Sequence, residues 1–171
     1  MQGQITPAAP ACTANLTFFG GPQGNTTIAA GGCSTLLNDF NLIDGFVQAD
    51  FTVGSQPLTL FGHYLQNQEA SDLDAAWASG FSYGKASNPM TWEFGYFYQS
   101  VEKDSQFGQF LDSDFGGGVT DTKGSVFRLG FAPAKNWVLN GTYFMNDRFV
   151  DAAGATQRNY DRYQLDLNFK F

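Results

Sequence analysis

Apolar and polar residues alternate along most of this chain, and the alternation is strictest at the C-terminal end. Over residues 160–171 every second side chain from Tyr163 onward is apolar, and the side chains between them are polar. Successive side chains of a β-strand point to opposite faces of the sheet, so this pattern predicts a strand with one apolar and one polar face. The apolar positions are Tyr163, Leu165, Leu167, Phe169 and Phe171, and the polar ones are Arg162, Gln164, Asp166, Asn168 and Lys170.

Six further segments upstream show the same alternation. We expect strands over residues 42–53, 58–67, 76–83, 91–99, 126–131 and 137–146. With roughly nine to twelve residues in each strand, they approach the length that a tilted strand needs to cross a bilayer. The connections alternate in length, which is typical of outer-membrane barrels with short turns on one side and long loops on the other. The short connections are 54–57, 85–90 and 133–136, and the longer ones are 68–75, 102–123 and 148–158.

The sequence therefore predicts an all-β fold, an antiparallel up-and-down transmembrane β-barrel with seven to eight strands in this chain. A soluble up-and-down barrel such as a lipocalin is the alternative, because its strands also alternate. The face opposite the aromatic side chains decides between the two. It carries charged residues such as Asp44, Glu93 and Arg128. A dry core would not accept these charges unpaired, whereas a water-filled lumen would.

Composition favours a protein whose outer surface does not face water. Charged residues make up 15% of the chain, against roughly 25% in a soluble domain. Aromatic residues make up 16%, with 18 Phe, and there are 20 Gly. The net charge of -7 argues against a nucleic-acid partner, whose phosphates require clustered Lys and Arg. No run of about 18 apolar residues is present, so no transmembrane helix is predicted.

Residues 1–40 differ from the rest of the chain. They are rich in Gly, Ala and Thr, and we expect a loop there with at most one strand, near residues 14–20, followed by barrel strands over 41–171. Cys12 and Cys33 lie in this stretch, and their even number and loop context favour a disulfide, with two free thiols as the alternative. The first residues show no signal peptide, and bacterial single-chain barrels have even strand numbers. We therefore expect the chain to be the C-terminal part of a longer barrel.

The polar face of the predicted strands is the candidate pore lining. It comprises Asp44, Gln48, Asp50, His63, Glu93, Arg128, Asn140, Arg162, Gln164, Asp166 and Lys170. His63 is the only histidine, and the sequence gives no support for a Ser–His–Asp relay around it, so we expect no catalytic site and no enzyme. Because there is no close cysteine pair and no second histidine, we expect no metal site and no cofactor.

The stretch DSDFGGG, residues 112–118, allows two interpretations. Asp112 and Asp114, with Asp121 beyond them, have the chemistry of a Ca²⁺ site. Their spacing does not fit the EF-hand pattern, which adds a third side-chain ligand before its glycine and ends on a glutamate. We favour the other interpretation, a glycine-kinked loop that folds over or into the barrel mouth.

Five segments together resemble the C-terminal part of the Gram-negative "putative porin" family. They are NLIDGFVQADF (41–51), PLTLFGHYLQN (57–67), WEFGYFYQSVE (92–102), FLDSDFGGGVTDTKG (110–124) and YDRYQLDLNFKF (160–171), and the resemblance extends over residues 38–171. The most specific piece is DSDFGGGVTD. The resemblance implies a larger, channel-forming barrel in a bacterial outer membrane, without catalytic residues. The terminal strand also resembles the signal that such barrels present to the bacterial barrel-assembly machinery, carried here by Leu165, Leu167, Phe169 and Phe171.

We expect a passive outer-membrane channel for small hydrophilic solutes or ions. The alternative is a closed small outer-membrane barrel with a structural or adhesive role, because about eight strands fill their own lumen whereas roughly 16–18 leave an aqueous channel. The expected partners are outer-membrane lipid, lipopolysaccharide and, during insertion, the assembly machinery. Nucleic acid is not expected as a partner, and the sequence does not decide whether the chain forms a homo-oligomer. Acidic side chains outnumber basic ones in the predicted long loops, which favours a weak preference for cations.

Overall fold

The fold consists almost entirely of β-strands. The computed structural model describes residues 23–30, 33–151 and 156–170. The elements in these ranges are β1 (Thr27–Ala30), β2 (Cys33–Leu36), β3 (Leu42–Val53), β4 (Gln56–Asn67), β5 (Ala75–Gly84), β6 (Thr91–Val101), the 3-10 turn η1 (Gly108–Phe110), β7 (Thr122–Ala134), β8 (Trp137–Arg148) and β9 (Arg158–Phe169). Among the residues described, no helix has the length and apolar character that crossing a membrane requires.

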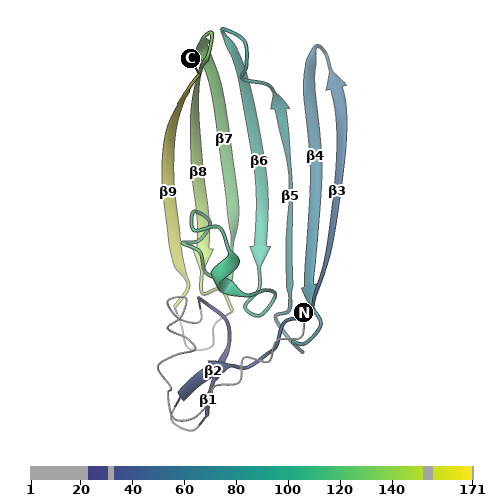
Figure 1. Cartoon of the computed structure of the whole chain (residues 1–171), viewed down its shortest axis with the longest axis vertical. Helices are drawn as coiled ribbons and strands as arrows, with labels where there is room; N and C mark the ends of the chain where they lie inside the picture. The colour runs from purple at the N-terminus through teal and green to yellow at the C-terminus, as the bar shows by residue number, and fades with distance from the viewer. Residues whose placement is uncertain (1–22, 31–32, 152–155, 171) are drawn as a thin grey trace.

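Strands β3 to β9 form one seven-stranded sheet in which each strand is antiparallel to the next one along the chain (Figure 1). This order confirms the predicted all-β, up-and-down arrangement and its seven strands. Some strand ends differ from the prediction: β7 runs from Thr122 to Ala134, whereas the alternation predicts only residues 126–131. The register between β7 and β8 shifts between Phe131 and Ala134, where Pro133 has no N–H to donate to the ladder.

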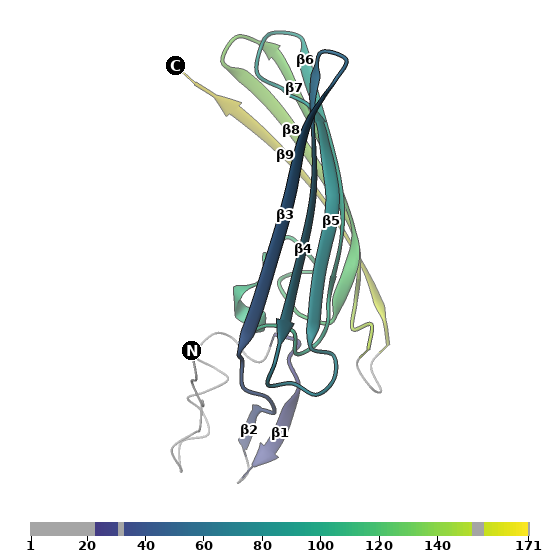
Figure 2. The ribbon, with the colours of Figure 1, turned by 90° about the vertical axis from the view of Figure 1, so that its right-hand side faces the viewer.

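The seven-stranded sheet is curved and open. In the described part of the chain β3 and β9 lie at its two edges and are not paired with each other. Figure 2 shows the strands bending, so that the sheet has a concave and a convex side. The sheet is therefore a curved wall, as expected of part of a barrel.

The N-terminal stretch contains two short strands, β1 and β2, which pair with each other and form a sheet of their own (Figure 1). The expectation of at most one strand within residues 1–40 is therefore wrong. Each strand has only four residues, too few for an alternation to be recognised, although a glycine pair between two short runs is a hairpin signal. Residues 14–20 and Cys12 lie outside the described residues, so a strand there and the pairing of Cys12 with Cys33 stay predictions.

The connections alternate in length as predicted. Three short ones, 54–55, 85–90 and 135–136, lie at one end of the sheet, which we call the turn end (Figure 1). Gly54 and Asn136 have positive φ values of 65° and 69°, a conformation that these residue types adopt readily in tight turns. The long connections, 68–74, 102–121 and the described residues of 149–157, lie at the opposite end, which we call the loop end.

The pairing register brings alternate side chains to the same face across all seven strands. One row of directly opposed residues contains Asp50, Thr59, Ser82, Gly95, Arg128, Thr142 and Gln164. The adjacent row, on the other side of the sheet, contains Ala49, Leu60, Phe81, Tyr96, Phe127, Tyr143 and Tyr163. We call the side of the first row the inner face and the side of the second row the outer face. The inner row is polar or small and the outer row is apolar, as the alternation predicts.

The connection 102–121, which we call the inner loop, folds back onto the inner face at the loop end (Figure 2). Its Phe115 packs into the apolar cluster of the sheet and is 2% exposed. The other buried members of this cluster come from neighbouring strands and are Leu65, Ala76, Val101, Val126 and Phe144. The apolar core therefore lies between the inner loop and the sheet.

Candidate functional site

The outer face exposes a large amount of apolar side chain. Leu165 is 75% exposed, and Leu167 and Phe169 on the same strand are also exposed, so these three predicted assembly residues share the outer face; Phe171 lies outside the described residues. Further exposed apolar side chains on this face are Ile43, Val47, Phe51, Val53, Leu60, Tyr64, Trp77, Trp92, Leu129, Trp137, Leu139, Met145 and Tyr163. Soluble monomers rarely expose a contiguous apolar surface of more than a few hundred Å². This face therefore calls for an apolar environment.

Aromatic rings on the outer face contact one another from strand to strand. A continuous run joins Phe81, Tyr96, Phe127, Tyr143 and Tyr163 on β5 to β9, with ring centroids 6.2, 5.1, 6.2 and 4.4 Å apart. Nearer the turn end are two further ring pairs, Tyr83 with Trp92 at 5.8 Å and Trp137 with Phe169 at 4.7 Å. Aromatic girdles beside an apolar belt are a feature of barrels in outer membranes.

The apolar band of the outer face slants across the sheet. The row that contains Tyr64 on β4 and Trp77 on β5 reaches Lys123 on β7 and Asp147 on β8. On β9 the apolar positions begin only at Tyr163, which is closer to the turn end. Rows of opposed residues run perpendicular to the strands. Because the apolar band crosses these rows at a slant, the strands are not perpendicular to the band but tilted relative to it. Strands in a barrel are tilted in this way, by roughly 35–45°.

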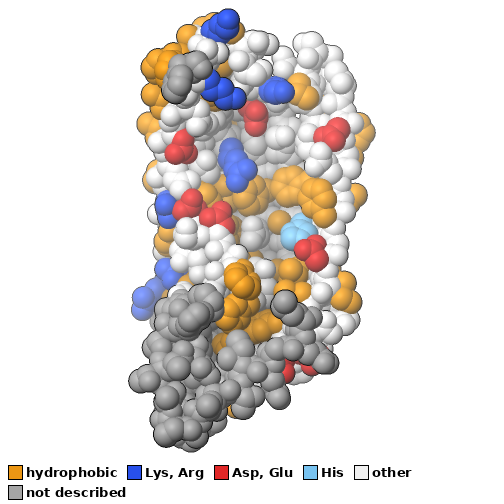
Figure 3. Space-filling view, viewed as in Figure 1, with side chains coloured by type: hydrophobic (Ala, Val, Ile, Leu, Met, Phe, Trp, Pro, Cys, Tyr) orange, Lys and Arg blue, Asp and Glu red, His pale blue; other side chains and the backbone are white. Residues whose placement is uncertain are grey.

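The inner face holds the predicted pore-lining residues. Those within strands all lie on it: Asp44, Gln48 and Asp50 on β3, His63 on β4, Glu93 on β6, Arg128 on β7, Asn140 on β8, and Arg162, Gln164 and Asp166 on β9. Lys170 follows the end of β9. Figure 3 shows basic and acidic side chains spread over this face, with the only histidine beside a carboxylate. Their common face is confirmed, whereas their role in lining a pore stays a prediction.

Some of these side chains are paired and others are not. His63 Nε2 lies 2.8 Å from Asp44 Oδ1 on the neighbouring strand. Asp50 accepts two side-chain hydrogen bonds, of 2.8 and 2.6 Å. Within the described ranges, Glu93 and Asp166 form no ion pair. Their carboxylates therefore contribute uncompensated negative charge to the inner face.

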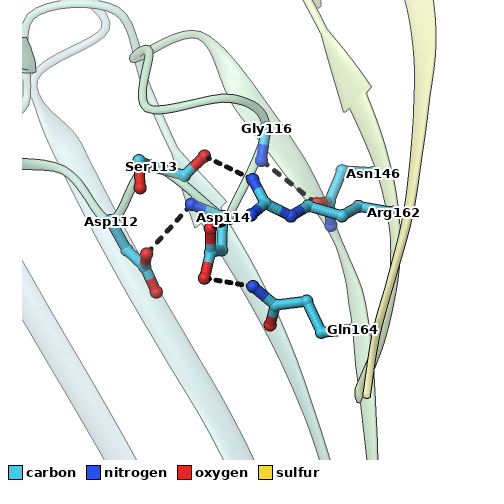
Figure 4. Close-up of polar contacts among 7 residues, drawn as sticks. All are labelled: Asp112, Ser113, Asp114, Gly116, Asn146, Arg162 and Gln164. Atoms are coloured by element: carbon cyan, nitrogen blue, oxygen red, sulfur yellow. Dashed lines mark hydrogen bonds and ion pairs between the residues drawn. The ribbon is translucent and has the colours of Figure 1, made fainter. Parts of the chain in front are cut away.

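The inner loop is fastened to the inner face by polar contacts around Asp114 (Figure 4). Arg162 Nη2 lies 2.8 Å from Asp114 Oδ1, and Gln164 Nε2 donates a hydrogen bond of 2.5 Å to Asp114 Oδ2. Arg162 and Gln164 are two residues apart on β9, so both side chains point to the same face and reach the same carboxylate. On the neighbouring strand, Asn146 Oδ1 accepts a hydrogen bond of 3.1 Å from Gly116 N. We call these contacts the loop clamp.

A run of three glycines lets the inner loop lie close to the sheet. Gly116, Gly117 and Gly118 have φ values of 57°, 75° and 72°, a region that other L-residues rarely adopt. A Cβ atom at Gly116 would also collide with the side chain of Thr122 on β7. The prediction of a glycine-kinked loop that folds inward is therefore confirmed by the conformation of this stretch.

The alternative interpretation of the same stretch, a Ca²⁺ site, finds no support in the geometry. Asp114 is engaged by Arg162 and Gln164. Asp121 is 1% exposed and accepts a hydrogen bond of 2.7 Å from the backbone of Asp151. Over the described ranges no group of three His, Cys, Asp or Glu side chains is placed to hold a metal ion.

A second anchor of the inner loop comes from the residues before β1. Asn25, which is 4% exposed, donates hydrogen bonds to the backbone carbonyls of Lys103 and Gln106 at 2.9 and 2.8 Å. Its Oδ1 accepts a hydrogen bond of 2.8 Å from Gly108 N. A single asparagine outside any periodic segment carries no signal in the sequence, so this anchor is visible only in the structure.

The fold and the site together define the wall of a porin-type barrel. The sheet is up-and-down, its outer face is apolar, its inner face is polar, and a loop is clamped inside it. The model of the family described as "Putative porin" matches residues 36–171, which is most of the chain. The chain therefore belongs to this family, as the resemblance in its sequence indicates. No curated protein and no solved structure matches the chain.

Proposed function

We propose that the chain forms part of the wall of a channel in a Gram-negative outer membrane, through which small hydrophilic solutes or ions diffuse passively. The observation that carries this proposal is the division of one sheet into an apolar outer face and a polar inner face, maintained over all seven strands. Lipid covers the outer face and water meets the inner face. Every backbone polar group in a bilayer must be bonded within the protein, and a barrel wall of paired strands meets this requirement.

The inner loop narrows the channel in this proposal. It lies against the inner face through Phe115 in the apolar cluster and through the ion pair of Asp114 with Arg162. Both contacts keep the loop inside the curved wall rather than above it. The space that the loop occupies is not available to solutes, so the loop sets part of the free cross-section.

The exposed charges favour cations over anions. Along the strands the inner face carries four acids, Asp44, Asp50, Glu93 and Asp166, and four bases, Arg128, Arg148, Arg158 and Arg162, with Lys170 after the end of β9. The inner loop adds three acids that are not buried, Glu102, Asp112 and Asp114, and one base, Lys103. The acidic excess therefore comes from the inner loop, one of whose acids, Asp114, is paired with Arg162. Rings of acidic side chains select for cations in channels. We therefore propose a weak cation preference.

We also propose the partners that this location implies. Leu165, Leu167 and Phe169 lie on the outer face of the terminal strand, in the alternating arrangement of the barrel-assembly signal. The assembly machinery binds this strand during insertion, and lipid together with lipopolysaccharide surrounds the outer face afterwards.

Planar-bilayer recording tests the channel and the inner loop together. Arg162→Gln and Asp114→Asn each break the same ion pair, but they change the charge of the inner face in opposite directions. If the loop narrows the channel, both variants increase the single-channel conductance, because each one releases the loop. Asp147→Asn removes a charge from the outer face and serves as the control with unchanged conductance.

Two results would contradict the proposal, one for the channel itself and one for the role of the inner loop. A protein that inserts into the bilayer without any defined conductance is not a channel. Conductance shifts of opposite sign in Arg162→Gln and Asp114→Asn would show an effect of charge alone, and the loop would then not be the narrowing element.

A further inference from the structure

Besides the buried Phe144, three phenylalanines of the strands lie on the inner face, where the alternation calls for polar side chains. Phe46 is 63% exposed and contacts His63 edge-on, with ring centroids 6.3 Å apart. Phe61 on β4 and Phe97 on β6 approach to 6.2 Å across β5, which has Gly80 between them in the register. Phe97 packs in part against the apolar cluster, but Phe46 does not. An apolar ring that faces water is unfavourable, so the exposure of Phe46 needs an explanation beyond the fold.

These rings line a groove between the inner face and the inner loop. The groove has a volume of ≈ 500 Å³ and is lined by Phe46, Phe61, Phe97, Glu93, Asp112 and Arg128 among others. Pockets that bind small molecules combine apolar and aromatic walls with a few placed polar groups, and volumes of roughly 300–1,000 Å³ are usual. The groove therefore has the size and the lining of a solute site. Figure 3 shows the same face, with apolar side chains beside acidic and basic ones.

The charges in the groove favour a cationic solute. Two carboxylates, Glu93 and Asp112, line it together with one guanidinium, Arg128. Glu93 forms no ion pair with any described residue, so its carboxylate is available. The Asp44 carboxylate, which lies 2.8 Å from His63, adds negative charge beside Phe46.

Arg128 shows what kind of group this wall accepts. Its Cζ lies 5.1 Å from the centroid of Phe97, in a cation–π contact. A guanidinium or ammonium group held over an aromatic ring within about 6 Å is attracted by the ring electrons. Phe46 and Phe61 offer further rings in the same groove, and no cation–π contact is made to either of them by a described residue.

We propose that this groove is a solute site for small organic cations that carry a guanidinium or ammonium group on an apolar body. The carboxylate of Glu93 pairs with the cationic head, and Phe46 and Phe61 cover the apolar body. This proposal rests on the proposed function, in which the inner face lines a channel, and it names the class of solute that the channel retains in passing.

Binding of two isosteric probes tests the site without any need for conduction. Butylguanidinium carries the guanidinium on an apolar chain, and butylurea replaces it by a neutral urea of nearly the same shape. We expect titration calorimetry with the protein in detergent to show binding of butylguanidinium at least about tenfold tighter than of butylurea, because a charge-assisted pair with Glu93 is lost in the second probe. Glu93→Gln should abolish this difference, and Phe61→Leu should weaken the binding of butylguanidinium about threefold or more, because an aromatic ring is lost. Asp147→Asn on the outer face is the charge-matched control and should leave both affinities unchanged.

Equal affinity for the two probes in the unaltered protein would overturn the proposed site. This comparison uses no variant, so its result does not depend on whether a variant folds. An undiminished preference in Glu93→Gln would overturn the role of that carboxylate. Bilayer recording separates this proposal from the proposed function. Conductance without a preference for butylguanidinium would support the proposed channel and contradict the proposed solute site. A preference for butylguanidinium without conductance would support the site and contradict the channel.

Discussion

Replacing Leu165 with arginine tests whether the outer face meets lipid. Leu165 lies on β9 opposite Gly141 of β8, and it is 75% exposed. A Cβ atom at Gly141 would meet no atom within 4 Å, so the space beside Leu165 is open and a longer side chain fits without collision. A loss of stability in Leu165→Arg therefore reports the surroundings of this face and not crowding.

The depth of Leu165 sets the expected magnitude. Phe169 packs against Trp137 at the turn end. Leu165 lies four positions before Phe169 on the same strand. With a rise of ~3.3 Å per residue and a tilt of ~40°, each residue adds ~2.5 Å of depth, which puts Leu165 ~10 Å below this ring pair. In an apolar belt ~25 Å tall that is close to the midplane, where an arginine costs ~2–4 kcal/mol. Leu167→Arg, at half this depth, should cost about half as much.

Guanidinium titrations of the protein in phospholipid vesicles, followed by Trp fluorescence, give the free energy of unfolding by linear extrapolation. Asn168→Arg is the matched control, because residue 168 lies on the inner face beside Val138 and a long cationic side chain there stays in water. We expect it to cost about 0.5 kcal/mol or less, as for other exposed sites. Equal losses in Leu165→Arg and Asn168→Arg would refute the assignment of the two faces. A larger loss in Leu167→Arg than in Leu165→Arg would refute the depth argument.

Two further predictions concern the terminal strand and the charges. Deleting residues 168–171 removes Phe169 and Phe171 from the proposed assembly signal, so we expect normal synthesis but loss of the heat-modifiable folded band on gels; an unchanged folded fraction would count against the signal. Reversal potentials across a KCl gradient should show a weak cation preference that fades toward 1 M salt, because the Debye length shortens from ~10 Å at 0.1 M to ~3 Å. An anion preference would contradict the charge argument.

The seven strands are predictable because apolar and polar side chains are separated onto the two faces of the sheet. A shift of one residue in register would exchange the apolar and polar sets, so the pattern is strongly constrained along each strand. For β3 the predicted range, 42–53, is the range observed. The ends of β7 are less predictable, because Gly124 and Pro133 interrupt the alternation without ending the strand.

The loop clamp and the groove are not predictable from periodicity, because both join segments that are distant in the sequence. Asp114 and Gln164 are 50 residues apart, and their hydrogen bond depends on the path of the whole inner loop. The alternation identifies Gln164 as an inner-face residue but says nothing of its partner. The composition of DSDFGGG does indicate an inward-folding loop, because consecutive glycines permit the positive φ values that the structure shows.

The apolar residues that break the alternation on the inner face differ widely in exposure. Leu65, Val126 and Phe144 are 8%, 0% and 3% exposed, because the inner loop covers them. These exceptions let the loop dock on an apolar surface instead of burying unpaired polar groups, which would cost free energy. Phe46 breaks the alternation in the same way but is 63% exposed, so no described part of the chain covers it. Docking of the inner loop therefore explains the buried residues but not Phe46, and the exposure of its ring is the observation on which the proposed solute site depends.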